Sequence, residues 1–313
     1  MNTQKHSLRL LQWLKYYQTN QVNVNVVNKI VYLNGLFWHI DKAHISILDR
    51  GFAYGDGLFE TFRSYSGKIF RVDDHLDRLY YSASLIFIEI PMTREEIKSA
   101  LNKLIILNGL SNALIRLTVT RGNQGSGINI DYDSAPTIAI HARPVIPNLQ
   151  IYYKKGVTVT LYKNSAYRTQ GISDQIKSCN YLSQIIMRER ALKVGSFEAV
   201  LLDNKNNITE GAISNIFLIK NKQLLTPQLN GFILKGITRQ VVLDLARANN
   251  MPCKETTVSK KNLYDADEIF ITNSGIEILP VVRVNSRNIN KGKPGPITKF
   301  LHMLFLKSFE DYA

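Results

Sequence analysis

The stretch "EAVLLDNKNNITEGAISNIFLI" (198–219) places two β-like segments on either side of a turn. "EAVLLD" (198–203) is predicted to be a strand, and "NKNN" (204–207) is a cluster of turn residues. "ITEGAISNIFLI" (208–219) is again β-like, and no helical pattern separates it from the strand before it. A parallel βαβ unit needs a crossover between its strands, so this mixed order of strands and helices predicts an α+β fold.

Similar patterns extend outward in both directions. Hairpins are predicted at 29–40, around Asn34-Gly35, and at 57–72, around Ser66-Gly67. A capping box joins Thr93 to Glu96 and starts a helix that Gly109 ends. Apolar periodicity predicts further helices at 76–86, 180–193, 236–250 and 295–309, and strands at 113–120, 157–163 and 268–275.

The length of 313 residues and the 45% hydrophobic content predict two domains. We expect a small domain over 30–145, a linker over 146–156 at the loop-like "RPVIPNLQ" (143–150), and a large domain over 157–313. Residues 1–29 contain no acid and include the basic, amphipathic "SLRLLQWLKYY" (7–17). This extension is a targeting segment, an extra helix or the product of an upstream start codon, and we favour the last two.

The chain carries 39 Lys and Arg against 25 Asp and Glu, a net charge of +14. This charge indicates either nucleic-acid binding or a dispersed basic surface. No Lys/Arg block or nucleic-acid-binding motif concentrates it, so we expect no nucleic-acid partner. No apolar run reaches the roughly 18 residues of a membrane span. Two cysteines make a disulfide framework or a multi-cysteine metal site unexpected, and they fit a reducing, cytoplasmic setting.

Two short segments suit an anion. "GxGxxG" and "GxxxxGK[ST]" are absent, so no Rossmann or P-loop signature is present. "GITR" (236–239) places free amides and a hydroxyl at a helix N-terminus, an arrangement that suits a phosphate. "TNSG" (272–275) offers a second nest of small residues after a strand. Taken alone, each segment is more often a plain cap or turn.

Lys177 lies in "DQIKSCNYL" (174–182), just before a predicted helix. A lysine in this polar context is normally solvated. A Schiff-base lysine, the alternative, needs burial and cationic neighbours to lower its pKa. Glu210 is usually structural in such a turn, but beside a Schiff-base lysine it could hydrogen-bond a pyridine nitrogen.

Five segments, in order and spacing, resemble the class IV aminotransferases. These fold-type IV pyridoxal-phosphate enzymes include branched-chain aminotransferases, D-amino acid aminotransferases and aminodeoxychorismate lyases. The resemblance runs from about Val31 to the C-terminus. It implies a small α/β N-terminal domain and a larger pseudo-barrel C-terminal domain. The segments are "DRGFAYGDGLFETFR" (49–63), "HLDRL" (75–79), "IKSCNYL" (176–182), "ITEGAISNIFLI" (208–219) and "LKGITRQVV" (234–242).

The resemblance implies pyridoxal 5'-phosphate as the cofactor. Lys177 would hold it covalently and then shuttle a proton, and Glu210 would keep the pyridine nitrogen protonated. Leu234 would pack on the ring and Tyr181 would lie near its phenolic oxygen. For His75 we favour a structural role at its helix start. The residues expected to hold the phosphate are Arg78, Ile237, Thr238 and Ser274.

The choice of substrate depends on the protein groups that bind the carboxylate and the side chain of the substrate. Arg116 points from a strand face opposite its apolar neighbours. It matches an arginine of branched-chain aminotransferases, as does Arg63 in "FETFR"; an exposed salt bridge is the alternative for either. The other expected substrate-binding residues are Tyr54, Phe59 and Gly275. We expect no metal site.

The subfamily is less clear from the motifs. "YGDGLFE" (54–60) is closer to D-amino acid aminotransferases and lyases. Ser126 and Ile128, however, stand where those groups place diagnostic cations, and "GKPGPITKFL" (292–301) resembles branched-chain enzymes. We therefore expect a transaminase acting on a branched-chain L-amino acid and a 2-oxo acid such as 2-oxoglutarate. A D-amino acid aminotransferase or a 4-amino-4-deoxychorismate lyase is the alternative. The family also implies a homodimer.

Overall fold

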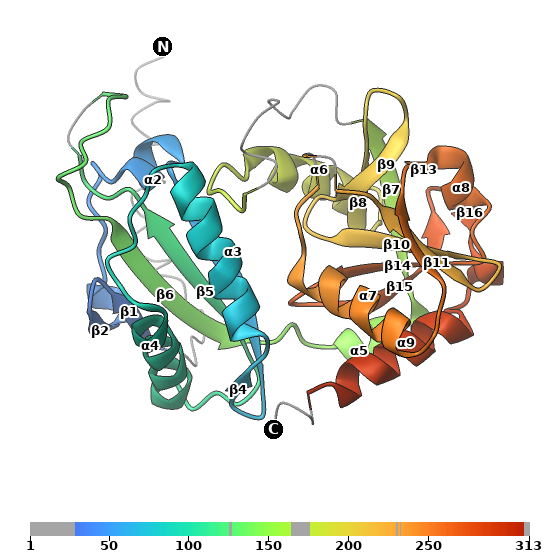
Figure 1. Cartoon of the computed structure of the whole chain (residues 1–313), viewed down its shortest axis with the longest axis horizontal. Helices are drawn as coiled ribbons and strands as arrows, with labels where there is room; N and C mark the ends of the chain where they lie inside the picture. The colour runs from blue at the N-terminus through green and yellow to red at the C-terminus, as the bar shows by residue number, and fades with distance from the viewer. Residues whose placement is uncertain (1–28, 125–126, 164–175, 230, 232, 310–313) are drawn as a thin grey trace, which may run out of the picture.

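The computed structural model describes residues 29–124, 127–163, 176–229, 231 and 233–309. It has two domains, each built on its own sheet (Figure 1). Strands and helices occur in mixed order, so the predicted α+β, two-domain fold is confirmed. The predicted extension, apart from Lys29, lies outside the described residues.

The small domain contains an antiparallel sheet in the order β2-β1-β6-β5-β3-β4. Its strands are β1 (Ile30–Leu33), β2 (Leu36–His39), β3 (Gly57–Tyr65), β4 (Lys68–Ile69), β5 (Ala113–Thr120) and β6 (Thr137–Pro144). Both predicted hairpin turns are confirmed. Asn34, Gly35, Ser66 and Gly67 all have positive φ, the left-handed conformation that a tight type I′ turn requires.

Helices α3 (Val72–Leu85) and α4 (Arg94–Leu107) pack on one face of this sheet. The predicted capping box is present: Thr93 accepts from the Glu96 amide, and Glu96 accepts from the Thr93 amide. Apolar side chains of both helices and of β3, β5 and β6 form the core of the domain. The opposite sheet face, which carries Phe59 and Arg116, faces the large domain. A short 3₁₀ turn η1 (Ile40–Lys42) and α2 (Arg50–Tyr54) connect β2 to β3.

The large domain is built on a mixed sheet in the order β12-β11-β10-β14-β15-β7-β8-β9-β13, with β16 beside β15. Its strands are β7 (Val157–Lys163), β8 (Glu198–Leu202), β9 (Asn207–Gly211), β10 (Asn215–Lys220), β11 (Gln223–Pro227), β12 (Cys253–Thr256), β13 (Val258–Ser259), β14 (Glu268–Asn273), β15 (Glu277–Val284) and β16 (Arg287–Asn288). β9 also contacts β10, and β13 contacts β11, so the two ends of the sheet curl toward each other. This curling agrees with the expected pseudo-barrel.

Helices surround this sheet. They are α5 (Leu149–Lys155), α6 (Leu182–Lys193), α7 (Ile237–Ala248), α8 (Lys260–Tyr264), η3 (Asn290–Gly292) and α9 (Pro296–Lys307). The predicted linker, 146–156, contains helix α5 over most of its length. Leu149 anchors α5 by packing into the large-domain core.

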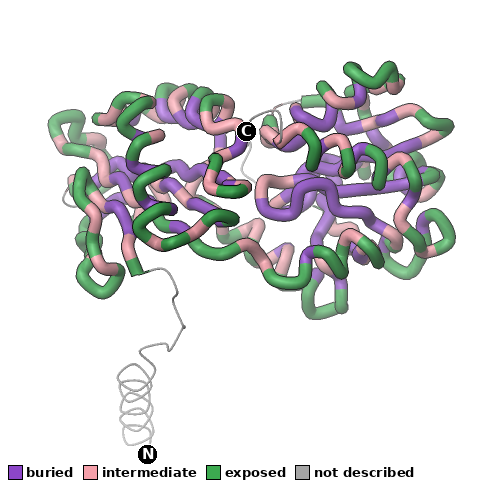
Figure 2. The backbone as a smooth tube through the Cα atoms, turned by 90° about the horizontal axis from the view of Figure 1, so that it is seen from below, coloured by how far each residue is buried: buried purple, intermediate pink, exposed green. Residues whose placement is uncertain are grey.

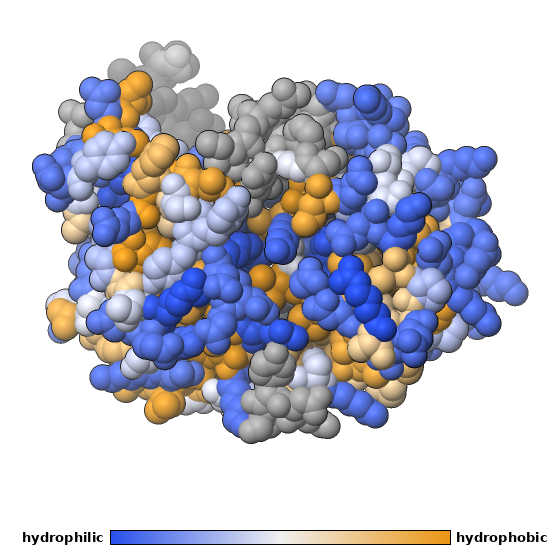
Figure 3. Space-filling view, in the orientation of Figure 1, coloured by the Kyte–Doolittle hydropathy of each residue, from blue (hydrophilic) through white to orange (hydrophobic). Residues whose placement is uncertain are grey.

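The two domains meet through an aromatic cluster at the end of the β3–β4 hairpin. Tyr65 stacks on Phe309 with ring centroids 3.6 Å apart, and Phe70 packs edge-on against Phe305 at 5.6 Å. Phe70 belongs to the same buried cluster as Phe217 of β10. The tube in Figure 2 shows buried residues running through both sheets. Figure 3 shows hydrophilic side chains gathered across the middle of one face, between α3 and α7.

Within the described residues, no helix has the length and apolar character needed to cross a bilayer. The same residues contain no cluster of three or more His, Cys, Asp or Glu arranged to hold a metal ion.

Candidate functional site

A cavity of about 260 Å³ lies between the small-domain sheet and the large domain. Segments that are far apart in sequence line it: β3 and β5 from one domain, and α6, the β9–β10 turn, the start of α7 and the β14–β15 loop from the other. The predicted site residues on its walls are Phe59, Arg78, Arg116, Lys177, Tyr181, Glu210, Leu234, Ile237, Thr238, Ser274 and Gly275. Tyr54 and Arg63 are not among them.

Lys177 lies in the extended segment before α6. Its main chain pairs with β3, because its carbonyl accepts from the Phe59 amide at 2.9 Å. Its Nζ lies 4.3 Å from the centre of the Phe59 ring and donates to Tyr181 Oη at 3.4 Å. Desolvation in the cavity, and then the charge of Arg78, lower the pKa of Lys177 to about 8. A substantial fraction of this amine is therefore neutral near pH 8.

Phe59 joins the lysine to a second cation. Its ring packs edge-on against Tyr181 at 5.0 Å, and the Arg116 guanidinium lies 3.7 Å from its centre. Burial lowers the pKa of Arg116. Among the described residues, Arg116 has no acidic partner within salt-bridge distance; its Nε donates only to Thr118 Oγ1 at 3.3 Å. The exposed salt bridge considered as an alternative role is thus not found.

Glu210 ends β9 and is buried, with 7% of its surface exposed. Its Oε2 accepts from the Leu234 amide at 3.1 Å and from Asn215 Nδ2 at 3.4 Å. Asn215 also donates to the Leu234 carbonyl at 3.0 Å. These bonds fix the carboxylate in the cavity wall beside Leu234. Asn215 was not predicted as a site residue, although "EGAISN" (210–215) lies within a quoted motif.

Arg78 is held by Glu60, a residue that the sequence did not single out. Nε and Nη2 of Arg78 donate to the two Glu60 oxygens, each at 2.7 Å, and Nη1 donates to the Lys235 carbonyl at 2.7 Å. Burial tends to raise the pKa of Glu60, but Arg78 and His75 outweigh it and leave the pKa below its usual value. The strict alternation of β3, which turns Glu60 toward α3, is the signal that could have identified it.

His75 completes this network. Burial lowers the pKa of His75, which keeps the ring neutral. A carboxylate only accepts hydrogen bonds, so the ring must carry its proton on Nδ1 and donate it to Glu60 Oε2 at 2.8 Å. His75 acts on the site indirectly, through Glu60 and Arg78, which agrees with the structural role expected for it.

The start of α7 presents unpaired amides to the cavity. Its N-cap, Gly236, has no side chain to accept them, and Ile237 and Thr238 line the cavity. A side chain at Gly236 would collide with Asn215 Oδ1, so the close approach requires glycine. Thr272 also lines the cavity, and its Oγ1 is buried with no hydrogen-bond partner in the described structure. These groups together suit a multiply charged anion.

The β14–β15 loop carries Ser274 and Gly275. Asn273 Oδ1 accepts from the amides of Gly275 and Ile276 at 2.8 and 3.0 Å, and the Gly275 carbonyl accepts from Arg63 Nη1 at 3.1 Å. Arg63, expected to bind substrate, thus contacts the loop that carries Gly275 and does not line the cavity. Its Nη2 also pairs with Glu277 at 2.9 Å, so its charge is neutralised behind the loop. Gly275 lines the cavity, but its amide is already engaged.

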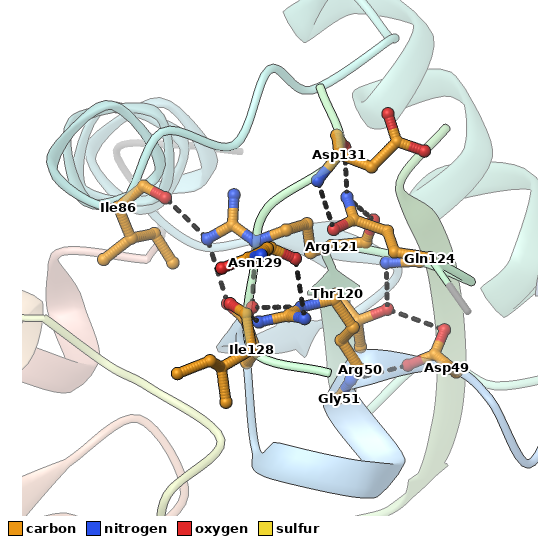
Figure 4. Close-up of polar contacts among 12 residues, drawn as sticks. Asp49, Arg50, Gly51, Ile86, Thr120, Arg121, Gln124, Ile128, Asn129 and Asp131 are labelled. Atoms are coloured by element: carbon orange, nitrogen blue, oxygen red, sulfur yellow. Dashed lines mark hydrogen bonds and ion pairs between the residues drawn. The ribbon is translucent and has the colours of Figure 1, made fainter. Parts of the chain in front are cut away.

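Tyr54, also expected to bind substrate, does not line the cavity of its own chain. Tyr54 ends α2, is 45% exposed and lies under the Arg50 guanidinium at 5.0 Å, away from the cavity. Arg50 in turn fastens the loop after β5 by donating to the carbonyls of Gly127 and Asn129 at 2.8 and 3.3 Å (Figure 4). Ser126 lies outside the described residues.

Arg121 anchors the same region from its other side (Figure 4). It donates to the carbonyls of Ile86 and Phe87 and pairs with Asp56, which also binds Arg50. Asp56 thus orients both arginines, and Arg50 holds the loop through its carbonyls, while the Ile128 side chain in that loop is 81% exposed.

Known proteins share this sequence and fold. A family model described as "Amino-transferase class IV" matches residues 57–284. A putative branched-chain-amino-acid aminotransferase of Methanocaldococcus jannaschii is 39% identical over 275 residues, which cover 88% of this chain and 94% of that protein. A D-alanine aminotransferase of Listeria monocytogenes is 35% identical over 270 residues, which cover 85% and 91%.

The solved structure of a branched-chain amino acid aminotransferase from T.th., complexed with N-(5'-phosphopyridoxyl)-L-glutamate, superimposes with a TM-score of 0.81. It is 26% identical in sequence, and the match covers 90% of this chain and 93% of that one. The family model spans most of the chain, and both relatives align with more than four fifths of it. The chain therefore belongs to the class IV aminotransferase family.

Proposed function

We propose that this protein is a pyridoxal 5'-phosphate-dependent transaminase. It moves an amino group between a branched-chain L-amino acid and a 2-oxo acid such as 2-oxoglutarate. The observation that carries this proposal is Lys177: its amine, with a pKa lowered to about 8, lies in a cavity that also contains the buried carboxylate of Glu210. A surface lysine would have neither property.

The residues present fit this cofactor. The unpaired amides at the start of α7, together with Arg78, suit its phosphate, and the buried Thr272 hydroxyl has no protein partner among the described residues. Glu210 is the carboxylate placed to meet a pyridine nitrogen, and the Leu234 side chain would cover the ring. Tyr181 Oη, within reach of the lysine, would lie near the phenolic oxygen, and Ser274 would add a phosphate contact.

When bound, pyridoxal phosphate supplies an amino-group carrier and an electron sink. The protein supplies proton control. Lys177 Nζ can take and return a substrate proton near pH 8, because its pKa lies close to that pH. Glu210 is acceptor-only as a carboxylate, so it would hold a proton on the pyridine nitrogen. The Glu60 pair keeps the Arg78 guanidinium extended toward the Lys235 carbonyl and prevents it from swinging across the cavity.

Arg116 would bind the α-carboxylate of the substrate. It is the cation that shares Phe59 with Lys177 and lacks an acidic partner among the described residues. Leu114, Ile146 and Ile276 line the same cavity and offer apolar surface for a branched side chain. These walls favour a branched-chain substrate.

Two other activities of the family remain candidates. The 35% identity to a protein named D-alanine aminotransferase favours a D-amino acid substrate as the second candidate. A 4-amino-4-deoxychorismate lyase would share the cofactor. Half-reactions of the cofactor-loaded protein with matched L- and D-amino acids, followed by visible absorbance, separate the first two. Release of pyruvate without a 2-oxo acid would identify the lyase.

Lys177→Ala provides the direct test. The wild-type protein with pyridoxal phosphate should show visible absorbance that survives dialysis, and Lys177→Ala should lose both that absorbance and amino transfer. Lys193→Ala, an exposed lysine at the end of α6, is the matched control and should behave as wild type. If the wild-type protein binds no pyridoxal phosphate, the proposal is wrong.

We further propose that the protein is a cytoplasmic homodimer. Both cysteines are free thiols, as a reducing compartment would keep them. The small domain exposes a group of apolar side chains around α2: Ile45, Ile47, Leu48 and Phe52 are between 47 and 77% exposed. Such a patch is typical of an interface. Sedimentation equilibrium should give twice the chain mass of 35.6 kDa; a monomer at micromolar concentration would contradict the proposal.

A further inference from the structure

A second buried carboxylate lies behind the cavity and has no role in the reaction so far. Glu198, the first residue of β8, has 0% of its surface exposed. Its strand partner Val159 on β7 and its same-face neighbour Val200 on β8 are buried apolar residues. An ionised carboxylate in such a place costs free energy that an apolar side chain would avoid. Glu198 is therefore a candidate for a functional role.

Glu198 binds the turn between β9 and β10. Its Oε2 accepts from Ser214 Oγ at 3.4 Å, and its Oε1 accepts from the Ala199 amide at 2.9 Å. Gly211, at the other end of the turn, passes so close that a Cβ there would collide with Ser214 Oγ and lie 3.3 Å from Glu198 Cγ. The carboxylate and the Ser214 hydroxyl thus fill the back of the turn, and glycine at position 211 makes room for them.

The turn connects Glu198 to Glu210. The Ser214 carbonyl accepts from the Gly211 amide at 2.6 Å, which closes the turn directly after Glu210. Ser214 is followed by Asn215, whose Nδ2 donates to Glu210 Oε2 at 3.4 Å. A shift of Ser214 would therefore move both the backbone beside Glu210 and the amide group that binds its carboxylate.

The same turn is part of the cavity wall. All four of its residues, 211–214, line the cavity. On that side Asn273 Nδ2, from the end of β14, donates to the Ile213 carbonyl at 3.0 Å. The turn is thus held between Asn273 on one side and Glu198 on the other, and its position decides where the Glu210 carboxylate lies.

The surroundings of Glu198 place its change of charge near neutral pH. Desolvation is the largest effect and raises the pKa of Glu198 to about 7, although the charge of Arg188 opposes the shift. Of the neighbouring elements, α6 contributes Arg188, β9 contributes Glu210 and β7 contributes the apolar Val159. When ionised, the carboxylate only accepts hydrogen bonds and so matches the hydroxyl donor of the turn. When protonated, it carries a donor of its own and loses this match.

We propose that Glu198 is a positioning residue: as a carboxylate it fixes the β9–β10 turn and thereby holds Glu210 where the pyridine nitrogen of the cofactor would lie. This inference rests on the proposed function, in which Glu210 meets that nitrogen. Glu198 is not among the described residues that line the cavity, so it acts through the turn. The groups that suit the cofactor phosphate lie at the start of α7 and do not depend on it.

Cofactor affinity at two pH values tests the proposal. Glu198→Gln keeps the size of the side chain and removes its charge. At pH 8 the cofactor-free variant should bind pyridoxal phosphate about tenfold more weakly than wild type, the usual effect of losing a charge-assisted hydrogen bond. At pH 6 the two affinities should converge, because Glu198 is then largely protonated in wild type. A loss of the same size at both pH values would mean a merely structural role and would overturn the proposal.

Two controls show whether the effect is local. Glu189→Gln removes an exposed carboxylate from α6 and should bind pyridoxal phosphate as wild type does at both pH values. Inorganic phosphate is the second control, as a competitor that should occupy only the start of α7. At pH 8 it should compete equally well in wild type and in Glu198→Gln. An equal weakening of inorganic phosphate and pyridoxal phosphate would overturn the proposal.

Urea unfolding of the cofactor-free proteins confirms that the variant folds and reads the charge directly. The pKa of Glu198 rises from 4.5 to about 7 on folding, so this group's contribution to wild-type stability is present below pH 4.5 and is lost as the pH rises through 7. The variant lacks this loss. Its urea midpoint relative to wild type should therefore increase from pH 5 to pH 8, and a difference independent of pH would overturn the inference.

The proposed function and this inference fail in different ways. If wild type binds no pyridoxal phosphate, the proposed function is wrong. If wild type binds it and Glu198→Gln binds it equally well at pH 8, only the positioning role of Glu198 is wrong.

Discussion

At the residue scale, the fold changes the chemistry of Lys177. The sequence contains 39 lysines and arginines, and most of the described ones lie where water keeps them charged. Lys177 instead loses solvent and gains Arg78 and Arg116 as neighbours, so its pKa falls to about 8. The lysine is destabilising as a cation in the cofactor-free protein, which is the usual cost of preparing a reactive amine.

This cost predicts the effect of Lys177→Met on the cofactor-free protein. The unfolded chain binds the lysine proton up to its ordinary pKa of 10.5, whereas the folded chain releases it near pH 8. Wild-type stability should therefore rise with pH through this window. At pH 7 the variant should be more stable by about 1–3 kcal/mol, and the gap should close toward pH 10. Urea unfolding at several pH values measures it; a gap independent of pH would contradict the shift.

Glu60 shows how little a single position reveals. The sequence "FETF" places a carboxylate at a core-facing position of β3, which would be costly without partners. His75 and Arg78 bind this carboxylate, but both lie on α3. Their distance to Glu60 therefore depends on how α3 packs against the sheet. The sequence therefore identified Arg78 through its motif, but it did not identify Glu60, which binds the Arg78 guanidinium.

At the element scale, β3 controls the β14–β15 loop. Arg63 crosses from the small domain to pair with Glu277, which has an unfavourable left-handed φ of 55° and also bonds to Tyr65 and His302. The same guanidinium holds the Gly275 carbonyl. A strand of one domain thus fixes the loop that carries Ser274 in the other.

Arg63→Lys should separate these two roles. Lysine can keep the ion pair with Glu277, but a single ammonium cannot reproduce the fork that also reaches Gly275. We expect the melting temperature to change little and the affinity of the cofactor-free protein for pyridoxal phosphate to fall about tenfold. Arg247→Lys, which keeps an exposed pair with Asp244, is the control. Equal affinities in the two variants would mean that the loop does not depend on Arg63.

At the scale of the whole molecule, the aromatic cluster couples the domains. Phe70 is 9% exposed and belongs to the large-domain cluster with Phe217 and Phe305, although its hairpin belongs to the small domain. The cavity lies between the domains, so its geometry depends on this contact.

Phe70→Ala should cost about 3–5 kcal/mol, because it leaves a void in a packed aromatic cluster. We also expect it to split unfolding into two steps. The substitution Trp13→Phe leaves Trp38 of β2 as the single tryptophan, so its fluorescence reports on the unfolding of the small domain. Far-UV circular dichroism reports on the unfolding of both domains. The two urea curves should coincide for wild type and diverge for the variant. Phe300→Ala on α9, a 39% exposed ring, is the control and should leave them coincident.

The sequence by itself determined the hairpins, the helix starts and the motif residues of the site. These features depend on neighbours a few positions apart: Asn34-Gly35 needs a left-handed turn, and Thr93 caps its own helix. The tertiary structure decided what each side chain meets. It paired Arg63 with Glu277, left Tyr54 outside the cavity of its own chain, and placed Arg143 and Arg188 on the walls of one cavity. Charge and burial depend on distances between elements, and these distances are set only when the two sheets pack.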